Sequence, residues 1–275
     1  MIPLPFLNQV IEGDCLQIMH GWPPNCIDMV LCDPPFGFTQ NTWDQCIDLT
    51  YLWQILARIV KPSGAILLFG QGSFTAELIL SNREQFRYKI VWIKSKATNF
   101  LNRLKQPLRK HEDICVFYKE QATFNPQMGR GKSYQVHRKG FKKETYGDFN
   151  SHTSSSDGQR YPTDVILYES YDFIYSRTCE HTNDGFYHPT QKPVELGSSL
   201  VRTYSNPGDT ILDFACGSGS FLVAAAIENR QFIGIELNKN ITKNGLPVDL
   251  IEVCRQRLKI FKQRSYSEFL WTPFH

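Results

Sequence analysis

Short apolar runs alternate with amphipathic stretches along most of the chain. The runs at residues 27–32 and 65–69 are typical of buried strands. Between them, apolar residues recur at helical spacing from 49 to 60, and Lys61-Pro62-Ser63-Gly64 predicts the end of that helix. Strands that alternate with helices in this way predict an α/β fold around a mostly parallel sheet.

The alternation continues on both sides of a central segment. Residues 86–93 and 114–118 predict two further strands, which could pair antiparallel. After Pro189 we expect a helix at 194–204, a strand at 210–213, a helix at 220–227, a strand at 231–236 and a helix at 248–262.

The central segment breaks this pattern. From about 120 to 187, glycine, serine, lysine, tyrosine and histidine dominate, and neither a helical nor a strand period persists. The chain has 275 residues, a length that suits one large domain or two small ones. We therefore predict one α/β domain from residues 1–119 and 187–275, with an irregular insertion at 120–186.

The formal net charge is only +3, but the charges are unevenly spread. Residues 101–143 contain eleven basic and three acidic side chains, a local charge of +8, so the remainder carries −5. Charged runs often lie on ordinary solvated surfaces. This one is interleaved with phenylalanine and tyrosine, which also suits a polyanion with bases that can stack, such as nucleic acid.

The remaining composition excludes several classes of protein. The eight cysteines form no Cys-x-x-Cys pair, so we expect free thiols in a reducing cytosol and no metal site. The longest apolar runs are much shorter than the ~20 residues that cross a bilayer. The N-terminus lacks the pattern of a signal peptide. We therefore expect a cytoplasmic protein without membrane association.

A glycine-rich segment, Asp213-Phe214-Ala215-Cys216-Gly217-Ser218-Gly219-Ser220, follows one predicted strand and opens a helix. The next strand ends at Glu236, where a carboxylate can bind ribose hydroxyls. No third glycine stands at the spacing that binds a pyrophosphate. The segment therefore favours a nucleoside-containing cofactor without phosphates over NAD.

Asp33-Pro34-Pro35-Phe36 stands where the predicted strand at 27–32 ends. Prolines are common in structural turns, but an aromatic ring here could also stack on a planar base. Asp33 and the carbonyl of Pro34 could accept hydrogen bonds from an exocyclic amino group. Two acceptors would draw that nitrogen toward tetrahedral geometry and free its lone pair for attack.

A third motif, His188-Pro189-Thr190-Gln191-Lys192-Pro193, precedes a predicted helix. Together the three motifs, and their order along the chain, resemble the beta arrangement of the S-adenosylmethionine-dependent DNA amino-methyltransferases. In that family the Asp-Pro-Pro-aromatic motif comes early and the cofactor motifs come late, with a target-recognition segment between them. The segments 12–15, 61–64 and 109–112 are also similar to recurring family segments.

This resemblance implies a doubly wound, Rossmann-like, seven-stranded sheet with an antiparallel hairpin at one edge and a target-recognition role for the insertion. It implies that the target base is held and activated by Asp33, Pro34, Pro35 and Phe36. The cofactor site it implies comprises Asp14, Cys15, Asp33, Thr190, Lys192, Asp213, Phe214, Ala215, Cys216, Gly217, Gly219, Glu236 and Leu237. From their charge and position we expect DNA contacts from Lys94, Lys96, Arg103, Arg109, Arg130 and Arg138.

The chain departs from the family pattern at two positions. Phe36 replaces a frequent tyrosine, which keeps the stacking ring and loses a hydroxyl. Ala215 stands where a phenylalanine is usual, and Phe214 lies one residue early.

The resemblance implies methyl transfer from S-adenosylmethionine to an exocyclic amino group of a flipped-out base in double-stranded DNA. Asp33 in the first catalytic position favours adenine over cytosine as the target. An amino-directed cytosine methyltransferase is the closest alternative. A nicotinamide enzyme and a DNA-binding module without catalysis are alternatives of other classes. Association with the nucleoid, a homodimer and a cognate restriction nuclease are further expectations.

Overall fold

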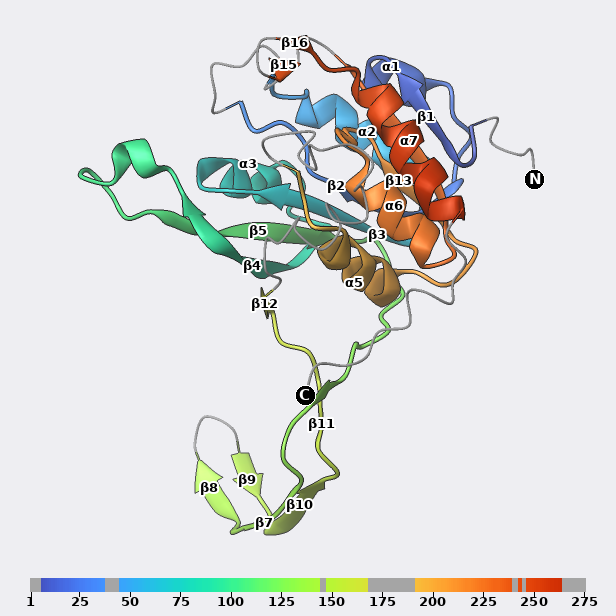
Figure 1. Ribbon diagram of the computed structural model, residues 1–275. Helices are drawn as coiled ribbons and strands as arrows, with labels where there is room; N and C mark the ends of the chain where they lie inside the picture. Colours follow the sequence, from blue (N-terminus) through green and yellow to red (C-terminus); the bar gives the residue numbers. More distant parts are fainter. Residues whose placement is uncertain are drawn as a thin grey trace. The chain divides into compact units, whose positions relative to one another are not determined.

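The computed structural model describes residues 6–37, 45–143, 147–167, 191–238, 242–243 and 246–263 (Figure 1). The chain divides into two compact units, which we describe separately. The sheet unit comprises Met1–Asn125 and Asp164–His275, and the ribbon unit comprises Pro126–Thr163. Their boundaries differ from the predicted insertion at 120–186, because residues 165–167 add a strand to the main sheet.

Within the described residues, the sheet unit is built on an eight-stranded sheet. Its spatial order is β1 (Gln9–Glu12), β14 (Gln231–Glu236), β13 (Thr210–Asp213), β2 (Ile27–Cys32), β3 (Val60–Gly70), β5 (Arg109–Phe117), β4 (Phe86–Thr98) and β12 (Val165–Leu167). Of these eight strands, β5 alone runs antiparallel to its neighbours, which confirms the mostly parallel sheet. The sheet has one strand more than the predicted seven, because the three-residue β12 pairs with the outer edge of β4.

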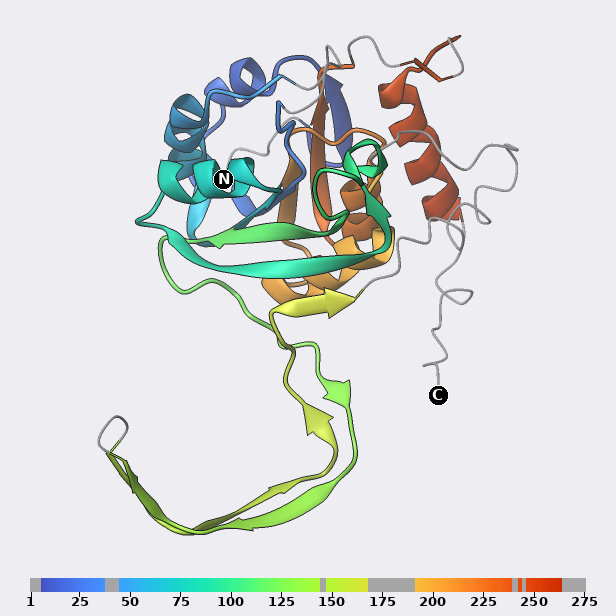
Figure 2. The ribbon, with the colours of Figure 1, turned by 90° about the vertical axis from the view of Figure 1, so that its left-hand side faces the viewer.

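Helices cover both faces of this sheet (Figure 2). One layer consists of α1 (Cys15–His20), α2 (Leu49–Ile59) and α3 (Ser73–Ser81), and the other of α5 (Val194–Tyr204), α6 (Ser220–Ile227) and α7 (Leu250–Gln263). In β2, Met29 and Leu31 enter one core, whereas Val30 and Cys32 enter the other. A strand buried on both faces has a continuous apolar sequence, as the pattern at 27–32 predicts.

Several predicted elements have the observed bounds. Helices α5 and α6 and strands β13 and β14 begin and end where the sequence predicts. The helix α2 starts after Asp48, whose side chain accepts a hydrogen bond from the Tyr51 backbone N–H. It ends at Ile59, and residues 61–64 lie inside β3 instead of a turn.

The short elements β1, α1 and α3 were not predicted. The four residues of β1 and the six of α1 are too few to display a period. No helix in the described part of the chain is long and apolar enough to span a membrane.

The ribbon unit consists of short antiparallel strand pairs. These are β6 (Gly129–Arg130) with β11 (Gln159–Arg160), β7 (Tyr134–Arg138) with β10 (His152–Ser156), and β8 (Phe141–Lys143) with β9 (Gly147–Phe149). All five side chains of β7 are exposed. The individual strands of this unit were not predicted, because a ribbon that is open to solvent on both faces has no apolar alternation. The described elements are completed by the 3₁₀ helix η1 (Phe100–Asn102) and the strands β15 (Thr242–Lys243) and β16 (Leu246–Pro247).

Candidate active site

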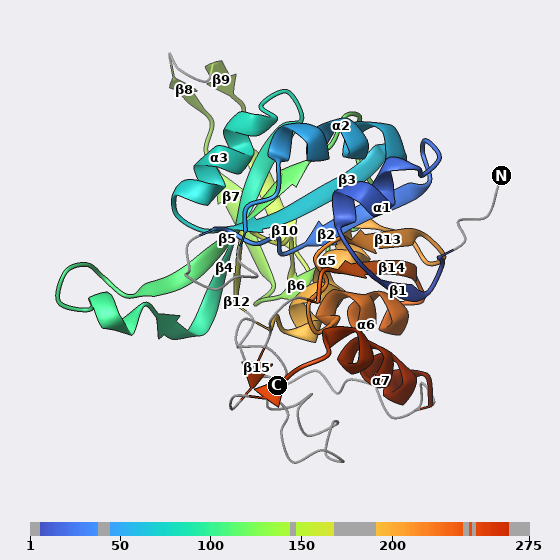
Figure 3. The ribbon, with the colours of Figure 1, turned by 90° about the horizontal axis from the view of Figure 1, so that it is seen from above.

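A pocket of about 500 Å³ opens at the carboxyl ends of the central parallel strands. Figure 3 shows the order of these strands from above. In doubly wound sheets, ligands bind at this edge. Asp33 follows β2, Glu236 ends β14 and residues 214–217 follow β13, so strands from the two halves of the chain meet here. The predicted site residues that line it are Asp14, Cys15, Asp33, Pro34, Pro35, Phe36, Lys94, Arg109, Lys192, Phe214, Ala215, Cys216, Gly217, Glu236 and Leu237.

The other predicted site residues lie elsewhere. Asp213 and Gly219 stand behind the pocket wall, and Lys96 and Arg103 lie in and after β4. Arg130 and Arg138 belong to the ribbon unit. Thr190 lies outside the described residues, as do His188 and Pro189.

The glycine-rich turn is tightly held from behind. Gly217 and Gly219 adopt positive φ angles of 51° and 78°. A Cβ atom on Gly219 would come within 2.9 Å of the Cys254 Sγ atom, so a side chain here would strain the backbone and require Cys254 to move. Arg257 of α7 donates a hydrogen bond to the Ser218 hydroxyl at 3.0 Å. These contacts fix the turn against α7 and present its backbone to the pocket.

Glu236 forms the polar wall next to this turn. Its Oε2 atom accepts a 2.7 Å hydrogen bond from the Gly217 N–H, and its Oε1 atom accepts one of 3.1 Å from the Asn238 N–H. Burial raises the pKa of this carboxyl above its usual range. A carboxylate oxygen can accept more than one hydrogen bond, so the side chain retains acceptors for the hydroxyls of a ribose.

The turn between β1 and α1 lines the pocket next to Glu236. The Gly13 N–H donates to the Glu236 carbonyl at 2.9 Å, which joins this turn to β14. Asp14 accepts a 3.0 Å hydrogen bond from the Gln17 N–H and thereby caps α1. Burial raises the pKa of the Cys15 thiol to about 12, so this cysteine is a neutral part of the wall.

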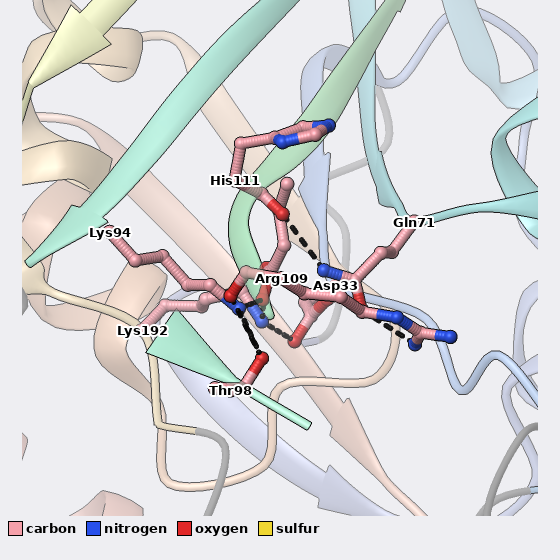
Figure 4. Close-up of polar contacts among 8 residues, drawn as sticks. Asp33, Gln71, Lys94, Thr98, Arg109, His111 and Lys192 are labelled. Carbon is pink, nitrogen blue, oxygen red and sulfur yellow. Dashed lines mark hydrogen bonds and ion pairs between the residues drawn. The ribbon is translucent and has the colours of Figure 1, made fainter. Parts of the chain in front are cut away.

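Four charged residues meet at the catalytic end of the pocket, and we call them the charge cluster: Asp33, Lys94, Glu112 and Lys192. Figure 4 labels Asp33, Lys94 and Lys192 of this cluster. Lys192 Nζ contacts Asp33 Oδ2 and lies 3.3 Å from Glu112 Oε2. Lys94 Nζ lies 3.1 Å from both Glu112 Oε1 and Thr98 Oγ1. Strands β4 and β5, the turn after β2 and the segment before α5 therefore meet in one ion-pair network.

The second oxygen of Asp33 is in a different situation. Asp33 Oδ1 is buried and has no hydrogen-bond partner among the described residues. Because its Oδ2 atom is held by Lys192, the carboxylate is fixed in orientation with one acceptor left open. A buried acceptor without a partner is costly, which makes this oxygen a candidate ligand-binding atom.

Burial sets the protonation behaviour of the cluster. It raises the pKa of Asp33 to about 6, with Glu112 adding to the rise and Lys192 and Lys94 opposing it. Burial also acts to raise the pKa of Glu112, but Lys192 and Lys94 together hold it below its usual value. The pKa of Lys192 is raised, because its two carboxylate neighbours outweigh burial. As the pH rises above about 6, Asp33 is therefore increasingly present as the carboxylate that pairs with Lys192.

Phe36 is held beside these charges. Its ring centroid lies 5.0 Å from that of Phe74 in α3, with the planes tilted by 32°. The ring still lines the pocket, so it offers a flat apolar surface near Asp33.

Two of the predicted lysines form ion pairs inside the pocket. Lys94, expected at DNA phosphates, is buried with an exposed fraction of only 7% and is paired with Glu112. Lys192, expected in the cofactor site, contacts Asp33. Glu112 itself was not among the predicted site residues. The only signal for it was the segment Arg109-Lys110-His111-Glu112, which resembles a family segment without revealing its partners.

Asp213 lies behind the pocket wall, next to the glycine-rich turn. It is buried, and burial raises the pKa of its carboxyl to about 8. It accepts a 3.4 Å hydrogen bond from the Ala215 N–H, at the start of the glycine-rich turn. Its place is consistent with a role in shaping the turn rather than contacting a ligand.

Comparison with known proteins identifies the class. Residues 27–245 match the DNA methylase family, so the chain belongs to this family of N6- and N4-directed DNA amino-methyltransferases. The predicted resemblance is therefore confirmed, and with it S-adenosylmethionine as the methyl donor.

Individual relatives give a consistent result. The chain is 27% identical over 261 residues to the DNA adenine methyltransferase YhdJ of Escherichia coli K12, covering 89% of this chain and 84% of that protein. It is 23% identical to the type II methyltransferase M.HpaI of Haemophilus parainfluenzae, covering 91% and 74%.

Two solved structures share the fold. The M1.HpyAVI–SAM complex matches with a TM-score of 0.58 and 20% identity, covering 91% of this chain and 98% of that one. The cytosine-N4-specific PvuII DNA methyltransferase matches with a TM-score of 0.56 and 12% identity, covering 93% of each chain. Adenine and cytosine enzymes thus both occur among the similar proteins.

Proposed function

We propose that this DNA methyltransferase acts on the N6 amino group of adenine in a base flipped out of double-stranded DNA. The observation that carries the proposal is the open, buried Oδ1 atom of Asp33, held in orientation by Lys192. Beside it, Pro34 and Phe36 line the same pocket.

The geometry supports activation of an amino group. Asp33 Oδ1 and the carbonyl of Pro34 would accept hydrogen bonds from the two protons of that group. The nitrogen lone pair would then be withdrawn from the ring and directed at the methyl donor. Phe36 would stack on the base and hold its plane.

S-adenosylmethionine, when bound, supplies an electrophilic methyl group on a positively charged sulfur. Glu236 and the turn at Gly217 would hold the cofactor so that its methyl carbon could pass to the amino nitrogen, with the electrons of the broken carbon–sulfur bond staying on sulfur. The nitrogen must also lose one proton. Asp33 is suited to accept it, because its pKa of about 6 lets it release the proton again near neutral pH.

The cofactor is expected to occupy the part of the pocket between the turn at Gly13 and the glycine-rich turn at residues 217–219. Glu236 would accept hydrogen bonds from the ribose hydroxyls, and Gly217 leaves open space for close backbone approach. Asp14, Cys15 and Leu237 line the same part of the pocket and would contact the adenine ring. The lining therefore matches the cofactor in three respects. A carboxylate can bind the ribose hydroxyls, a glycine turn allows close backbone approach, and apolar side chains can contact the adenine ring.

Adenine is favoured over cytosine by two observations. An Asp occupies the first catalytic position, which in this family is more typical of adenine enzymes. The adenine methyltransferase YhdJ is also similar over 89% of the chain. An amino-directed cytosine methyltransferase is the second candidate, supported by the shared fold of the PvuII enzyme.

The ribbon unit is our candidate for DNA recognition. Arg130, Gln135, His137 and Arg138 are exposed on its strands, where they can reach base edges or phosphates. M.HpaI and M.BglII are both named type II methyltransferases, which supports a place in restriction–modification with a cognate nuclease as partner.

The decisive experiment is a product analysis. The protein is incubated with methyl-labelled S-adenosylmethionine and unmethylated double-stranded DNA, and the digested nucleosides are identified by mass spectrometry. We expect label in N6-methyladenine. Label in N4-methylcytosine would replace the proposal by its alternative, and label in neither base would reject both.

A further inference from the structure

The connection between β4 and β5, residues 99–108, carries an unusual set of exposed apolar side chains. Leu101 is 92% exposed and Leu104 is 90% exposed, with Phe100 at 63% and Leu108 at 39%. Figures 1 and 3 both show this connection extending beyond the edge of the sheet. We call residues 99–108 the apolar finger. Single exposed leucines are common, but four apolar residues clustered on one loop indicate a binding surface.

The finger has a defined internal structure. The side chain of Asn102 donates to the side chain of Asn99 at 2.7 Å, and the Lys105 N–H donates to the Asn102 carbonyl at 2.8 Å. The Arg103 guanidinium lies 4.3 Å from the centroid of the Phe100 ring. Phe100 is thus partly covered by a cation, whereas Leu101 and Leu104 stay uncovered at the tip.

The base of the finger belongs to the catalytic pocket. Thr98 and Arg109, the residues on either side of it, both line that pocket. The Thr98 hydroxyl donates to the Arg109 carbonyl at 3.3 Å and closes the base. The Arg109 guanidinium donates to the Gln71 side chain at 3.1 Å, which fixes it to the turn after β3. A base bound at Asp33 would therefore lie in the same pocket as the two residues that flank the finger.

The charge around the apolar tip is entirely positive. Between residues 95 and 111 the sequence contains no Asp or Glu, and it contains the five basic residues Lys96, Arg103, Lys105, Arg109 and Lys110. Two copies of this finger would repel each other. A polyanion with an apolar interior matches both properties, since phosphates pair with the cations and the base stack accepts the leucines.

We propose that the apolar finger inserts Leu101 and Leu104 into the base stack of double-stranded DNA, at the gap left by the target base. Flipping a base costs a few kcal/mol in stacking and pairing. Apolar side chains in the gap recover part of the stacking contact and oppose return of the base. This inference rests on the proposed function, because it presupposes a flipped target base in the pocket.

The test compares a variant with the wild type on two duplexes. Once the methylated site is mapped, oligonucleotides are made with the target base either correctly paired or opposite a mismatched base. Leu101→Ala/Leu104→Ala is expected to lower kcat/KM on the paired duplex about tenfold, equivalent to about 1.4 kcal/mol. On the mismatched duplex, where flipping is easier, the reduction is expected to shrink to about twofold or less.

The matched control is Leu80→Ala, which removes a leucine that is 66% exposed on α3 and should change neither rate. An unchanged rate for the double variant, or an equal reduction on both duplexes, overturns the proposal. So does a reduced rate that follows dissociation of a protein dimer, measured by sedimentation without DNA. A wild-type protein that methylates no DNA would instead refute the proposed function, so the two failures are distinguishable.

Discussion

Charged side chains occur in two contrasting settings in this molecule. In the charge cluster, every charge is buried or nearly so and lies against an opposite charge, as in the pairs Lys94–Glu112 and Lys192–Asp33. In the ribbon unit, residues 126–163 contain seven basic and three acidic side chains, and Arg130, Lys132, Arg138 and Lys139 are exposed. Buried paired charges fix geometry, whereas exposed charges of one sign attract a distant polyanion. Substitutions should therefore act on catalysis in the first region and on DNA affinity in the second.

The largest effect is expected from Asp33→Ala. The variant removes the open acceptor Oδ1, while Lys192 keeps Glu112 as its partner, so the pocket should persist. We expect methyl transfer to fall about 10³-fold, comparable to removing a key transition-state hydrogen bond. The affinity for S-adenosylmethionine, measured by calorimetry, should change less than about threefold. An equal fall in cofactor affinity and in transfer would contradict the assigned role.

A more selective test of the cluster is Glu112→Gln. The wild-type rate should fall as the pH drops through about 6, because protonated Asp33 cannot accept both the hydrogen bond and the proton. Glu112 raises the pKa of Asp33, so its removal should move this acidic limb to lower pH. The pH profile of kcat/KM, which reports pKa values of the free enzyme, measures the shift.

The control is Glu84→Gln. This variant removes an exposed carboxylate just before the amino end of β4, away from the pocket. A profile for Glu112→Gln that coincides with the wild type would show that Glu112 does not act on Asp33. The variant leaves Lys94 without its carboxylate partner, so its Tm should be measured first.

In the ribbon unit, Arg130→Ala/Arg138→Ala should weaken binding to DNA without changing the chemistry. We expect KM for DNA to rise several-fold at moderate salt with kcat nearly unchanged. The slope of log K against log salt should become shallower by about one for each phosphate that the variant no longer binds. Arg83→Ala is the matched control, since Arg83 is exposed at the amino edge of the sheet, before β4 begins. A fall in kcat with unchanged KM would contradict the expectation that these arginines act on DNA affinity and not on catalysis.

The smallest effect on activity is expected from Asp213→Asn, because Asp213 is buried behind the pocket wall. Its pKa of about 8 in the folded protein lies above the 3.8 of a free Asp side chain. The stability that this raised pKa contributes is complete below pH 3.8 and disappears as the pH rises through 8. Asn cannot ionise, so the Tm of the variant should exceed that of the wild type at high pH by about 2–4 °C for each kcal/mol gained. The two Tm values should converge as the pH falls toward the acidic range, and a constant difference would contradict the assigned cause.

The sequence predicted the buried strands and the longer helices of the sheet unit, and it missed the exposed strands of the ribbon unit. The run 210–213 is apolar at its centre because β13 lies between two strands and two helical layers. The exposed strand β7 has no such constraint, so its sequence contains no strand period.

For the candidate site, the sequence indicated the residues at strand ends but not the pairing of charges between strands. Asp33, Gly217 and Glu236 stand at strand ends, where position alone indicates a ligand edge. The roles of Glu112 and Lys94 depend on a contact between β4 and β5, and no local pattern specifies which charges such a contact pairs.

The strand order has a consequence for how the protein is made. Strands β13 and β14 are the last of the main sheet to be synthesised, yet they fill the space between β1 and β2, which are among the first. At a translation rate of about 5–20 residues per second, roughly 10–40 s pass between the synthesis of β2 and that of its partner β13. During that time the nascent chain presents an apolar, unpaired strand on which other chains can pair. Chaperone demand during translation should therefore depend on the interval between residues 32 and 210, and an insertion there would lengthen this vulnerable period without touching the finished active site.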